Sequence, residues 1–214
     1  MRIYCLGVNE ALFSASDIPV SEVRFAFFSA LGTWKAKRAP CEACGWHWEY
    51  RASPFQVRWE PGSDVIGDFS WDGPYGYAFV VKEEVGAALQ KKGFTLDLLP
   101  VEYVKPKARR GMKCVPYPYA GPKLWWAECN AFVNLDLQAS GVALESSCAE
   151  CGNVRHTFRY KDIVINRREW HGEKMFRIKT NGRSRATFVS EEGFQEIQQA
   201  GFTNVAFSEA GEIR

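Results

Sequence analysis

Two short cysteine motifs are the residues in this sequence whose types and spacing best suit a metal site. Each is a Cys-x-x-Cys-Gly turn, which we call a knuckle: the first holds Cys41 and Cys44, and the second holds Cys148 and Cys151. Such a turn places two sulfurs on one side of a tight loop, and its glycine lets the backbone curl without a Cβ clash, so that an amide can approach a sulfur. Zn²⁺ takes four ligands in a tetrahedron, and thiolates suit it. One knuckle therefore supplies half a site, and two supply a closed one.

A closed site of four cysteines leaves no open position for a substrate, so its predicted role is structural rather than catalytic. The 103 residues from position 45 to position 147 separate the two knuckles. Closing a loop of about 100 residues costs roughly 4 kcal/mol plus a constant. Structural zinc affinities of about 10–16 kcal/mol in small peptides would offset that cost. We therefore predict one structural Zn²⁺, with Cys41, Cys44, Cys148 and Cys151 as its ligands and no catalytic residues.

Other interpretations of the cysteine motifs remain open. A redox Cys-x-x-Cys motif normally opens a helix in a thioredoxin-like unit, whereas aromatic, strand-like residues follow Cys44. The knuckles are also compatible with a lost metal or with pairing between subunits. His47 and His156 lie a few residues beyond a knuckle, but four cysteines already complete the shell. The remaining cysteines, at positions 5, 114 and 129, have no partner spacing. No catalytic triad, P-loop or dinucleotide-binding motif is visible, so we do not predict an enzyme.

A weak internal repeat organises the rest of the chain. Ala78–Leu99 aligns with Ala186–Phe207 at a constant offset of 108, and eight of the 22 aligned positions are identical. Each copy is typical of a strand, a helix and a second strand. The second helix has a good N-cap in Ser190. Gly93 and Gly201 lie where a left-handed residue ends a helix.

These elements predict an α+β fold with two pseudo-repeated halves. Each half would be a zinc knuckle with a β-hairpin, followed by a strand–helix–strand unit. The hairpins are expected over residues 46–59 and 157–165, and a helix is expected over Ser21–Leu31. We predict a single zinc-stapled domain, 1–214, in which pseudo-repeats of about 1–104 and 124–214 are joined by a connector, Lys105–Lys123. The connector holds six basic residues, no acidic residue and four prolines, which indicates an exposed, irregular segment.

Composition narrows the class of protein. Apolar residues make up 46% of the 214 residues and charged residues 24%, which is an ordinary globular balance. The net charge of +2 is too small to imply a nucleic-acid or membrane partner by itself. We expect no membrane partner, because no signal peptide and no apolar run long enough to span a bilayer is visible. Seven cysteines without an export signal favour a reducing compartment, so we expect a cytoplasmic protein.

With the knuckles and the repeat in view, the chain resembles the double-CXXCG motif family of myxobacteria, which includes Sit-type immunity proteins. The resemblance covers most of the chain. Besides the two knuckles it rests on the segments Trp59–Asp64 and Ile66–Phe69, and on the strand–helix units that end in Gly93-Phe94 and Gly201-Phe202. The knuckle pair is the specific part of the match.

The resemblance implies a cytoplasmic immunity protein that binds and neutralises a cognate protein toxin, which kin cells deliver through outer-membrane exchange. Composition and spacing do not imply this partner. They are compatible with a second function, a zinc-ribbon nucleic-acid-binding protein that uses the basic connector on phosphates. A third candidate is a redox enzyme, which requires a reactive thiolate at Cys41 or Cys148. We expect the connector to be simply solvated, so a nucleic-acid partner is the less favoured prediction.

Overall fold

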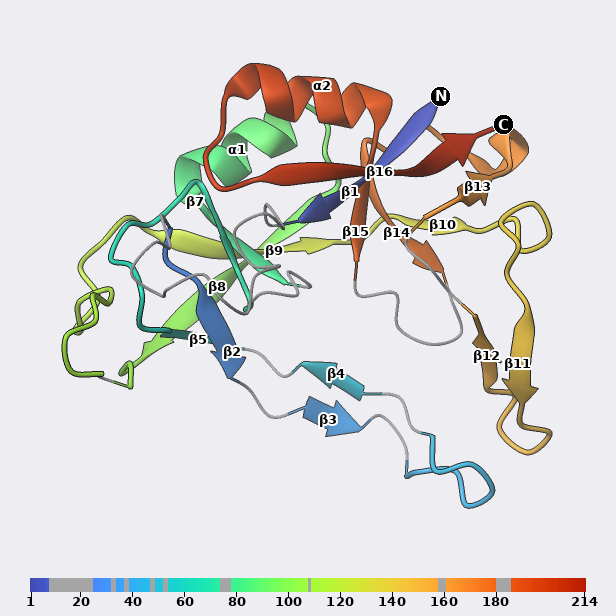
Figure 1. The fold of residues 1–214 in the computed structure, drawn as a ribbon, viewed down its shortest axis with the longest axis horizontal. Helices are drawn as coiled ribbons and strands as arrows, with labels where there is room; N and C mark the ends of the chain where they lie inside the picture. The colour runs from blue at the N-terminus through green and yellow to red at the C-terminus, as the bar shows by residue number, and fades with distance from the viewer. Residues whose placement is uncertain are drawn as a thin grey trace.

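The structure is a computed structural model of the whole chain. It describes residues 1–7, 25–31, 34–36, 39–46, 49–51, 54–73, 78–107, 109–157, 161–179 and 186–214. Figure 1 shows the arrangement of the elements: two curved sheets lie side by side, two helices cover one side of the molecule, and two β-arms extend from the opposite side. None of the helices in these ranges is both long and apolar enough to cross a membrane.

Each sheet has six strands. The order in the first sheet is β2 (Phe28–Leu31), β5 (Phe55–Trp59), β8 (Leu96–Val104), β9 (Leu124–Cys129), β7 (Phe79–Lys82) and β6 (Phe69–Trp71). The order in the second sheet is β10 (Phe132–Asn134), β14 (Met175–Lys179), β15 (Thr187–Ser190), β1 (Arg2–Gly7), β16 (Ala206–Ile213) and β13 (Ile163–Ile165). A parallel bridge from Phe28 to Asp72 brings β2 next to the end of β6, so the first sheet curls almost into a barrel.

Within the described residues, the remaining elements are two helices, two arms and one short 3₁₀ turn. Helix α1 spans Glu83–Lys91, α2 spans Glu191–Ala200, and the 3₁₀ turn spans Arg167–Glu169. The two arms are antiparallel strand pairs that stand apart from the sheets. They are made of β3 (Trp34–Ala36) with β4 (Glu49–Arg51), and of β11 (Leu144–Ser147) with β12 (Val154–His156).

The two sheets exchange a strand. β7 and β8 flank α1 in sequence, and the strand that lies between them in the sheet is β9, from beyond the connector. β15 and β16 flank α2 in the same way, and the strand between them is β1, from the N-terminus. In both sheets the central strand is antiparallel to its two neighbours. Each sheet therefore depends on a strand from the other part of the chain.

The predicted α+β class, with two pseudo-repeated halves built as knuckle, hairpin and strand–helix–strand unit, is wrong. The described chain is mostly β-structure, with two near-barrel sheets and two α-helices. The prediction weighted the repeat too heavily, because the repeat covers 22 residues in each copy and most other segments form strands. The strand exchange also means that neither half of the sequence forms its complete six-stranded sheet by itself.

The first expected hairpin is also wrong. Residues 55–59 were expected to pair with residues 46–50, but β5 pairs with β2 and, in parallel, with β8, while β4 pairs with β3. In the second hairpin, β13 pairs in parallel with β16, and positions 158–160 lie outside the described residues. The helix expected over Ser21–Leu31 is wrong at its C-terminal end, where Phe28–Leu31 forms β2. Its first four positions, 21–24, lie outside the described residues.

The repeated strand–helix–strand units form as the sequence predicts. Ser190 caps α2, because its Oγ accepts a hydrogen bond from the Gly193 amide at 3.2 Å. Gly201 ends the same helix with φ of +66°, which a residue with a Cβ rarely adopts. Helix α1 begins after Lys82, which makes no side-chain cap, but both helices carry two glutamates in their first turn, where the helix dipole favours them.

Three apolar cores are formed by the residues that the structure describes. One fills the first sheet around Phe28, Phe55 and Trp59, and a second fills the other sheet around Ile3 and Phe188. The third lies between the sheets and beneath both helices. It joins residues from both parts of the chain, among them Leu6, Trp71, Leu89, Cys129, Val189 and Ile197. Because alternate residues of a strand face opposite sides, β7 places Val80 in the first core and its neighbours in the third.

A polar contact reinforces the third core. The side chain of Asp68 accepts hydrogen bonds from the amide and the hydroxyl of Thr203 at 2.8 and 2.9 Å, and pairs with Lys82 at 2.9 Å. The Trp71 Nε1–H donates to the carbonyl of Asn204 at 2.7 Å. This inter-sheet contact joins a loop before β6 to the loop after α2, which lies about 135 residues further along the chain.

Candidate metal centre

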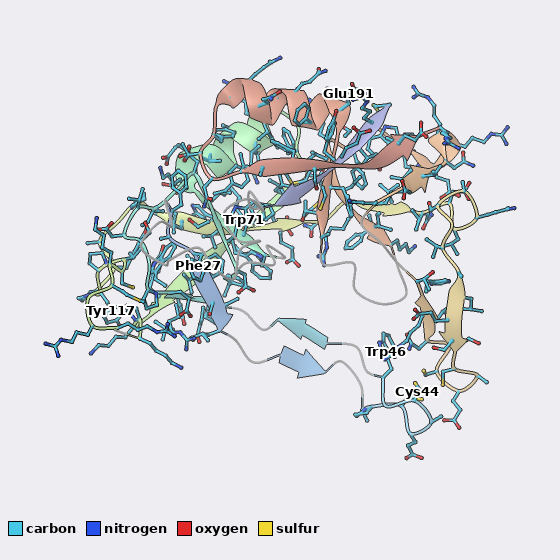
Figure 2. The ribbon with its side chains drawn as sticks, in the orientation of Figure 1. Phe27, Cys44, Trp46, Trp71, Tyr117 and Glu191 are labelled. Carbon is cyan, nitrogen blue, oxygen red and sulfur yellow. The ribbon has the colours of Figure 1, made fainter. Side chains whose placement is uncertain are left out.

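The two knuckles lie at the tips of the two arms. The first follows β3 and precedes β4, and the second lies between β11 and β12. The first predicted hairpin was therefore misplaced, and a strand precedes as well as follows each knuckle. Figure 2 shows the arms extending from the two sheets until their tips meet, with Cys44 and Trp46 at the meeting point.

The first knuckle is a tight turn closed by backbone hydrogen bonds. The Gly45 amide donates to the carbonyl of Cys41 at 2.7 Å, and the Cys41 amide donates to the carbonyl of Trp46 at 2.9 Å. Gly45 has φ of +67°, in the left-handed region where a Cβ is disfavoured. The amide of Trp46 lies on the sulfur of Cys44. The amide of Gly45 therefore closes the turn by donating to a carbonyl, and the amide of the next residue, Trp46, donates to a sulfur.

The second knuckle repeats this geometry. The Gly152 amide donates to the carbonyl of Cys148 at 2.9 Å, and the Cys148 amide donates to the carbonyl of Asn153 at 2.8 Å. Gly152 has φ of +68°, and the amide of Asn153 lies on the sulfur of Cys151. Two turns from distant parts of the chain therefore present two sulfurs each in the same way.

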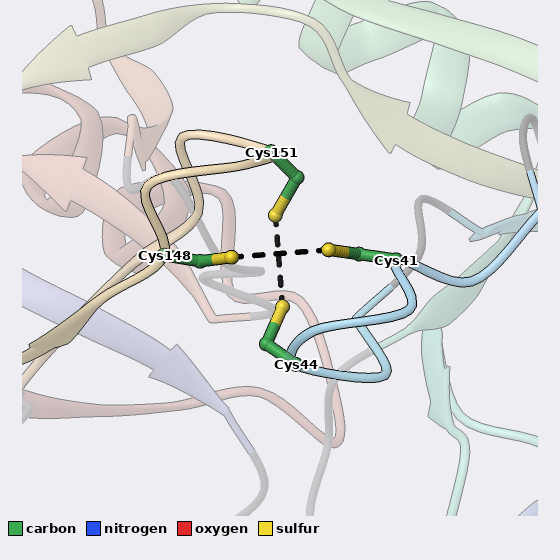
Figure 3. Close-up of side chains that lie close together, drawn as sticks. All are labelled: Cys41, Cys44, Cys148 and Cys151. Atoms are coloured by element: carbon green, nitrogen blue, oxygen red, sulfur yellow. Dashed lines mark hydrogen bonds between the residues drawn. The ribbon is translucent and has the colours of Figure 1, made fainter.

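The four sulfurs meet in one cluster, which we call the four-cysteine cluster (Figure 3). The Sγ atoms of Cys41 and Cys148 are 3.8 Å apart, those of Cys44 and Cys151 are 3.6 Å apart, and all four lie within 4.8 Å of one another. A disulfide bond would bring two sulfurs to about 2.05 Å, so these cysteines are free thiols. A regular tetrahedron with Zn–S bonds of about 2.3 Å has sulfurs about 3.8 Å apart. The cluster has the donors and the spacing to hold a metal ion such as Zn²⁺.

The pKa values of the thiols in the cluster are shifted in opposite directions. The backbone amide of Cys151, followed by that of Glu150, lowers the pKa of Cys148 to about 7. The amide of Asn153 acts in the same direction on Cys151, but loss of water and the neighbouring thiols outweigh it and raise the pKa of Cys151 to about 12. The pKa of Cys44 is raised against the pull of the Trp46 amide, for the same two reasons. A dipositive ion would remove this conflict, because coordination deprotonates a thiol outright.

Among the described residues, no other histidine or cysteine joins the cluster. His156 lies at the end of β12 and is partly exposed, and His47 lies outside the described residues. Cys129 is buried in the third core, where loss of water raises its pKa to about 11. Cys5 and Cys114 are half-buried and pack against the second and first cores. Burial also raises the pKa of Cys114, so the thiols of Cys114 and Cys129 are poor nucleophiles.

A scan of the chain against models of known protein families found no match, and a search of curated proteins found no relative. The assignment of a metal site therefore depends on the geometry of the four-cysteine cluster itself.

Proposed function

We propose that this chain is a cytoplasmic, non-enzymatic immunity protein that binds and neutralises a protein toxin, and that a structural Zn²⁺ in the four-cysteine cluster fixes its two arms. The cluster is the observation that carries the proposal. Its four thiols come two from each arm and account for all four positions of a tetrahedral ion. A site filled in this way has no position for a substrate, so a binding function fits the chain better than catalysis.

The toxin partner rests on the resemblance to the double-CXXCG family and on this absence of an open metal position. Among the described residues, the other cysteines are tied to apolar cores instead of facing a cleft. A cytoplasmic location agrees with seven free thiols, because a reducing compartment keeps them available for a metal.

The metal is tested by mass spectrometry under native conditions, with elemental analysis of the same sample. We expect one zinc per chain, and we expect a Cys41→Ser variant to lose it. Cys114→Ser is the matched control, since Cys114 is a half-buried cysteine outside the cluster. One ion bound between two chains, or a metal-free wild type with reactive thiols at the knuckles, would contradict the proposal.

The toxin is tested with the genes that lie beside this one in its source genome. Each neighbouring product is expressed in a host in which it stops growth, with and without this chain. We expect one neighbour to be toxic, growth to be restored by this chain, and the two proteins to co-purify. Rescue without a complex would point to an indirect effect, and no rescue by any pairing would refute toxin neutralisation.

Nucleic-acid binding is the second candidate, because the connector carries a run of exposed cations. Such binding would depend steeply on salt, and alanines at Lys107, Arg109 and Arg110 would weaken it. Failure to bind DNA or RNA at low ionic strength would exclude it.

A further inference from the structure

The second part of the connector, residues 113–122, is an irregular segment that is attached to the first sheet. Val115 is buried in the first core, and the ring of Tyr119 stacks on Tyr103 with centroids 3.9 Å apart. The Gly62 amide donates to the carbonyl of Lys113 at 2.8 Å, and the Tyr119 hydroxyl donates to the carbonyl of Pro122 at 2.6 Å. Prolines further restrict the backbone. A segment held in this way loses little conformational entropy when a partner binds it.

All six cations of the connector are exposed, and five of them are considered together: Lys105, Lys107, Arg109, Arg110 and Lys113. Within the ranges that the structure describes, none of the five forms an ion pair. Lys123, by contrast, pairs with Glu83 at 2.6 Å. The connector has no acidic residue of its own, although the chain as a whole has 25 acidic and 27 basic residues. The positive charge is therefore concentrated on one segment of a nearly neutral molecule, where it would attract a negatively charged partner.

Exposed apolar side chains lie among these cations. Tyr117 is 49% exposed and Met112 is 39% exposed, and both project from the connector. Figure 2 places Tyr117 at the opposite end of the molecule from Cys44. Tyr, Met and Arg are enriched in the centres of protein–protein interfaces. This combination of residues therefore matches an interface with another protein better than a solvated loop.

A pocket lies between the connector and the first sheet. It has a volume of about 420 Å³ and includes apolar walls from Ile66, Val115, Pro116 and Pro122. Lys82 and Asp64 add one charge of each sign to its lining. Lys82 is already paired with Asp68, so the apolar walls remain as the main attraction for a partner. One large apolar side chain would fit there.

We propose that the connector and this pocket form the surface that docks the protein partner, and that the partner presents an acidic segment bearing one large apolar side chain. The apolar side chain occupies the pocket lined by Pro116, the sequence neighbour of Tyr117, and the carboxylates face the exposed cations. This surface gives the partner of the proposed immunity function its chemical class, and to that extent rests on that function. The four-cysteine cluster lies at the opposite end and takes no part in the contact.

A nucleic acid would satisfy the cations but not the rest of the surface. Proteins that hold single strands stack successive bases on several aromatic side chains along a charged groove. Here the exposed aromatic residue of the connector is Tyr117, because Tyr119 already stacks on Tyr103. The apolar pocket has no counterpart in phosphate recognition. The observations therefore favour an acidic protein, and nucleic acid becomes an outcome of the test.

The test compares two arginine pairs. Arg109→Glu/Arg110→Glu reverses the exposed pair on the connector. Arg167→Glu/Arg168→Glu makes the same change in charge at an exposed Arg-Arg pair just after β13, in the second sheet. Thermal unfolding checks that both variants fold like wild type. Two probes are used: the toxin found by growth rescue, and a fluorescein-labelled peptide of alternating Asp and Glu with one central Leu. A single-stranded oligonucleotide of similar charge is the third probe.

We expect the connector variant to weaken binding of toxin and peptide by about tenfold or more, mainly at low salt. Tyr117→Ala should weaken toxin binding by about 30-fold, as for an interface hot spot. The control pair should stay within about twofold. If both arginine pairs have equal effects, the attraction comes from net charge and the docking surface is wrong.

The remaining outcomes separate the surface from the function. Tighter binding of the oligonucleotide than of the peptide, with the same dependence on Arg109 and Arg110, would overturn the proposal in favour of nucleic acid. If no toxin binds but the peptide shows the expected dependence, the immunity function fails and the surface stands. If neither toxin nor peptide binds, the docking surface is refuted as well.

Discussion

Removal of the metal should destabilise this protein without unfolding its sheets. The four-cysteine cluster ties together two arms whose knuckles are separated by 103 residues, positions 45 to 147. In the chain-entropy model, a cross-link that closes a loop of about 100 residues stabilises the folded state by about 4.7 kcal/mol at 25 °C. For a chain of this length each kcal/mol corresponds to roughly 2–4 °C, so the melting temperature should fall by about 10–20 °C.

The assay is thermal and urea unfolding of the zinc-loaded protein before and after a strong chelator, followed by far-UV circular dichroism. The spectrum of the chelated protein below its transition should stay close to that of wild type, because the three apolar cores and the Asp68 contacts do not involve the cluster. Cys41→Ser should reproduce the chelated protein, and Cys114→Ser should not.

Two results would refute this reasoning. If the chelator removes the ion with no change in the midpoint of unfolding, the cross-link does not constrain the chain. If the chelator instead abolishes β-structure, the cores are insufficient without metal, and the cluster would be essential for folding.

Three further predictions concern the contact between the sheets and the helix cap. Asp68→Asn should lower the free energy of unfolding by about 1–2 kcal/mol, because an amide replaces the carboxylate that accepts the hydrogen bonds from Thr203. Partial burial would raise the pKa of Asp68, but the Thr203 amide, Lys82 and the Thr203 hydroxyl outweigh it and hold the pKa below its usual value of 3.8. Wild type should therefore keep this contribution to the free energy of unfolding at neutral pH and lose it as the pH falls below about 4 and through the folded pKa of Asp68. Urea titrations of Asp68→Asn should not show that acid-dependent loss. Gly67→Ala should cost about 1–3 kcal/mol in the same assay, because the new Cβ would lie 2.5 Å from the Cβ of Asn204, whereas Gly7→Ala meets no atom within 4 Å and should cost nothing. Ser190→Ala should cost about 1 kcal/mol through loss of the cap on α2, and full stability of that variant would show that the cap is not needed.

The parts of this molecule that sequence reasoning predicted correctly are those set by short-range chemistry. A helix that follows Ser190 and ends at Gly201 is specified within about a dozen residues, and the structure has it there. The sequence predicts that the four thiols share one site, because each Cys-x-x-Cys-Gly turn supplies only two of the four ligands that Zn²⁺ takes. The structure brings the same four sulfurs together, which leaves the identity of the ion as a prediction.

Strand pairing could not be predicted from the sequence, because it depends on contacts between residues that are distant in the chain. The pattern of β5 predicts a strand, but no feature of it favours β8, some 40 residues later, over a nearby hairpin. The inter-sheet contact was missed for the same reason. Its only sequence signal is the Ile66–Phe69 segment. That segment contributes to the family resemblance, but its residue types do not indicate a contact. Gly67 and Asp68 acquire a role only when Thr203 and Asn204 lie beside them.

The strand exchange decides what the metal does. If the two halves folded separately, a zinc ion between their arms would be the main link between them, and its loss would let them part. Instead β1 pairs with β15 and β16, while β9 pairs with β7 and β8, so the halves cannot separate without breaking the centre of both sheets. The cluster therefore sets the position of the arms on a body that is already interlocked. This is why a large loss of stability on chelation is compatible with intact sheets, and why the docking surface at the far end should keep its affinity when the ion is removed.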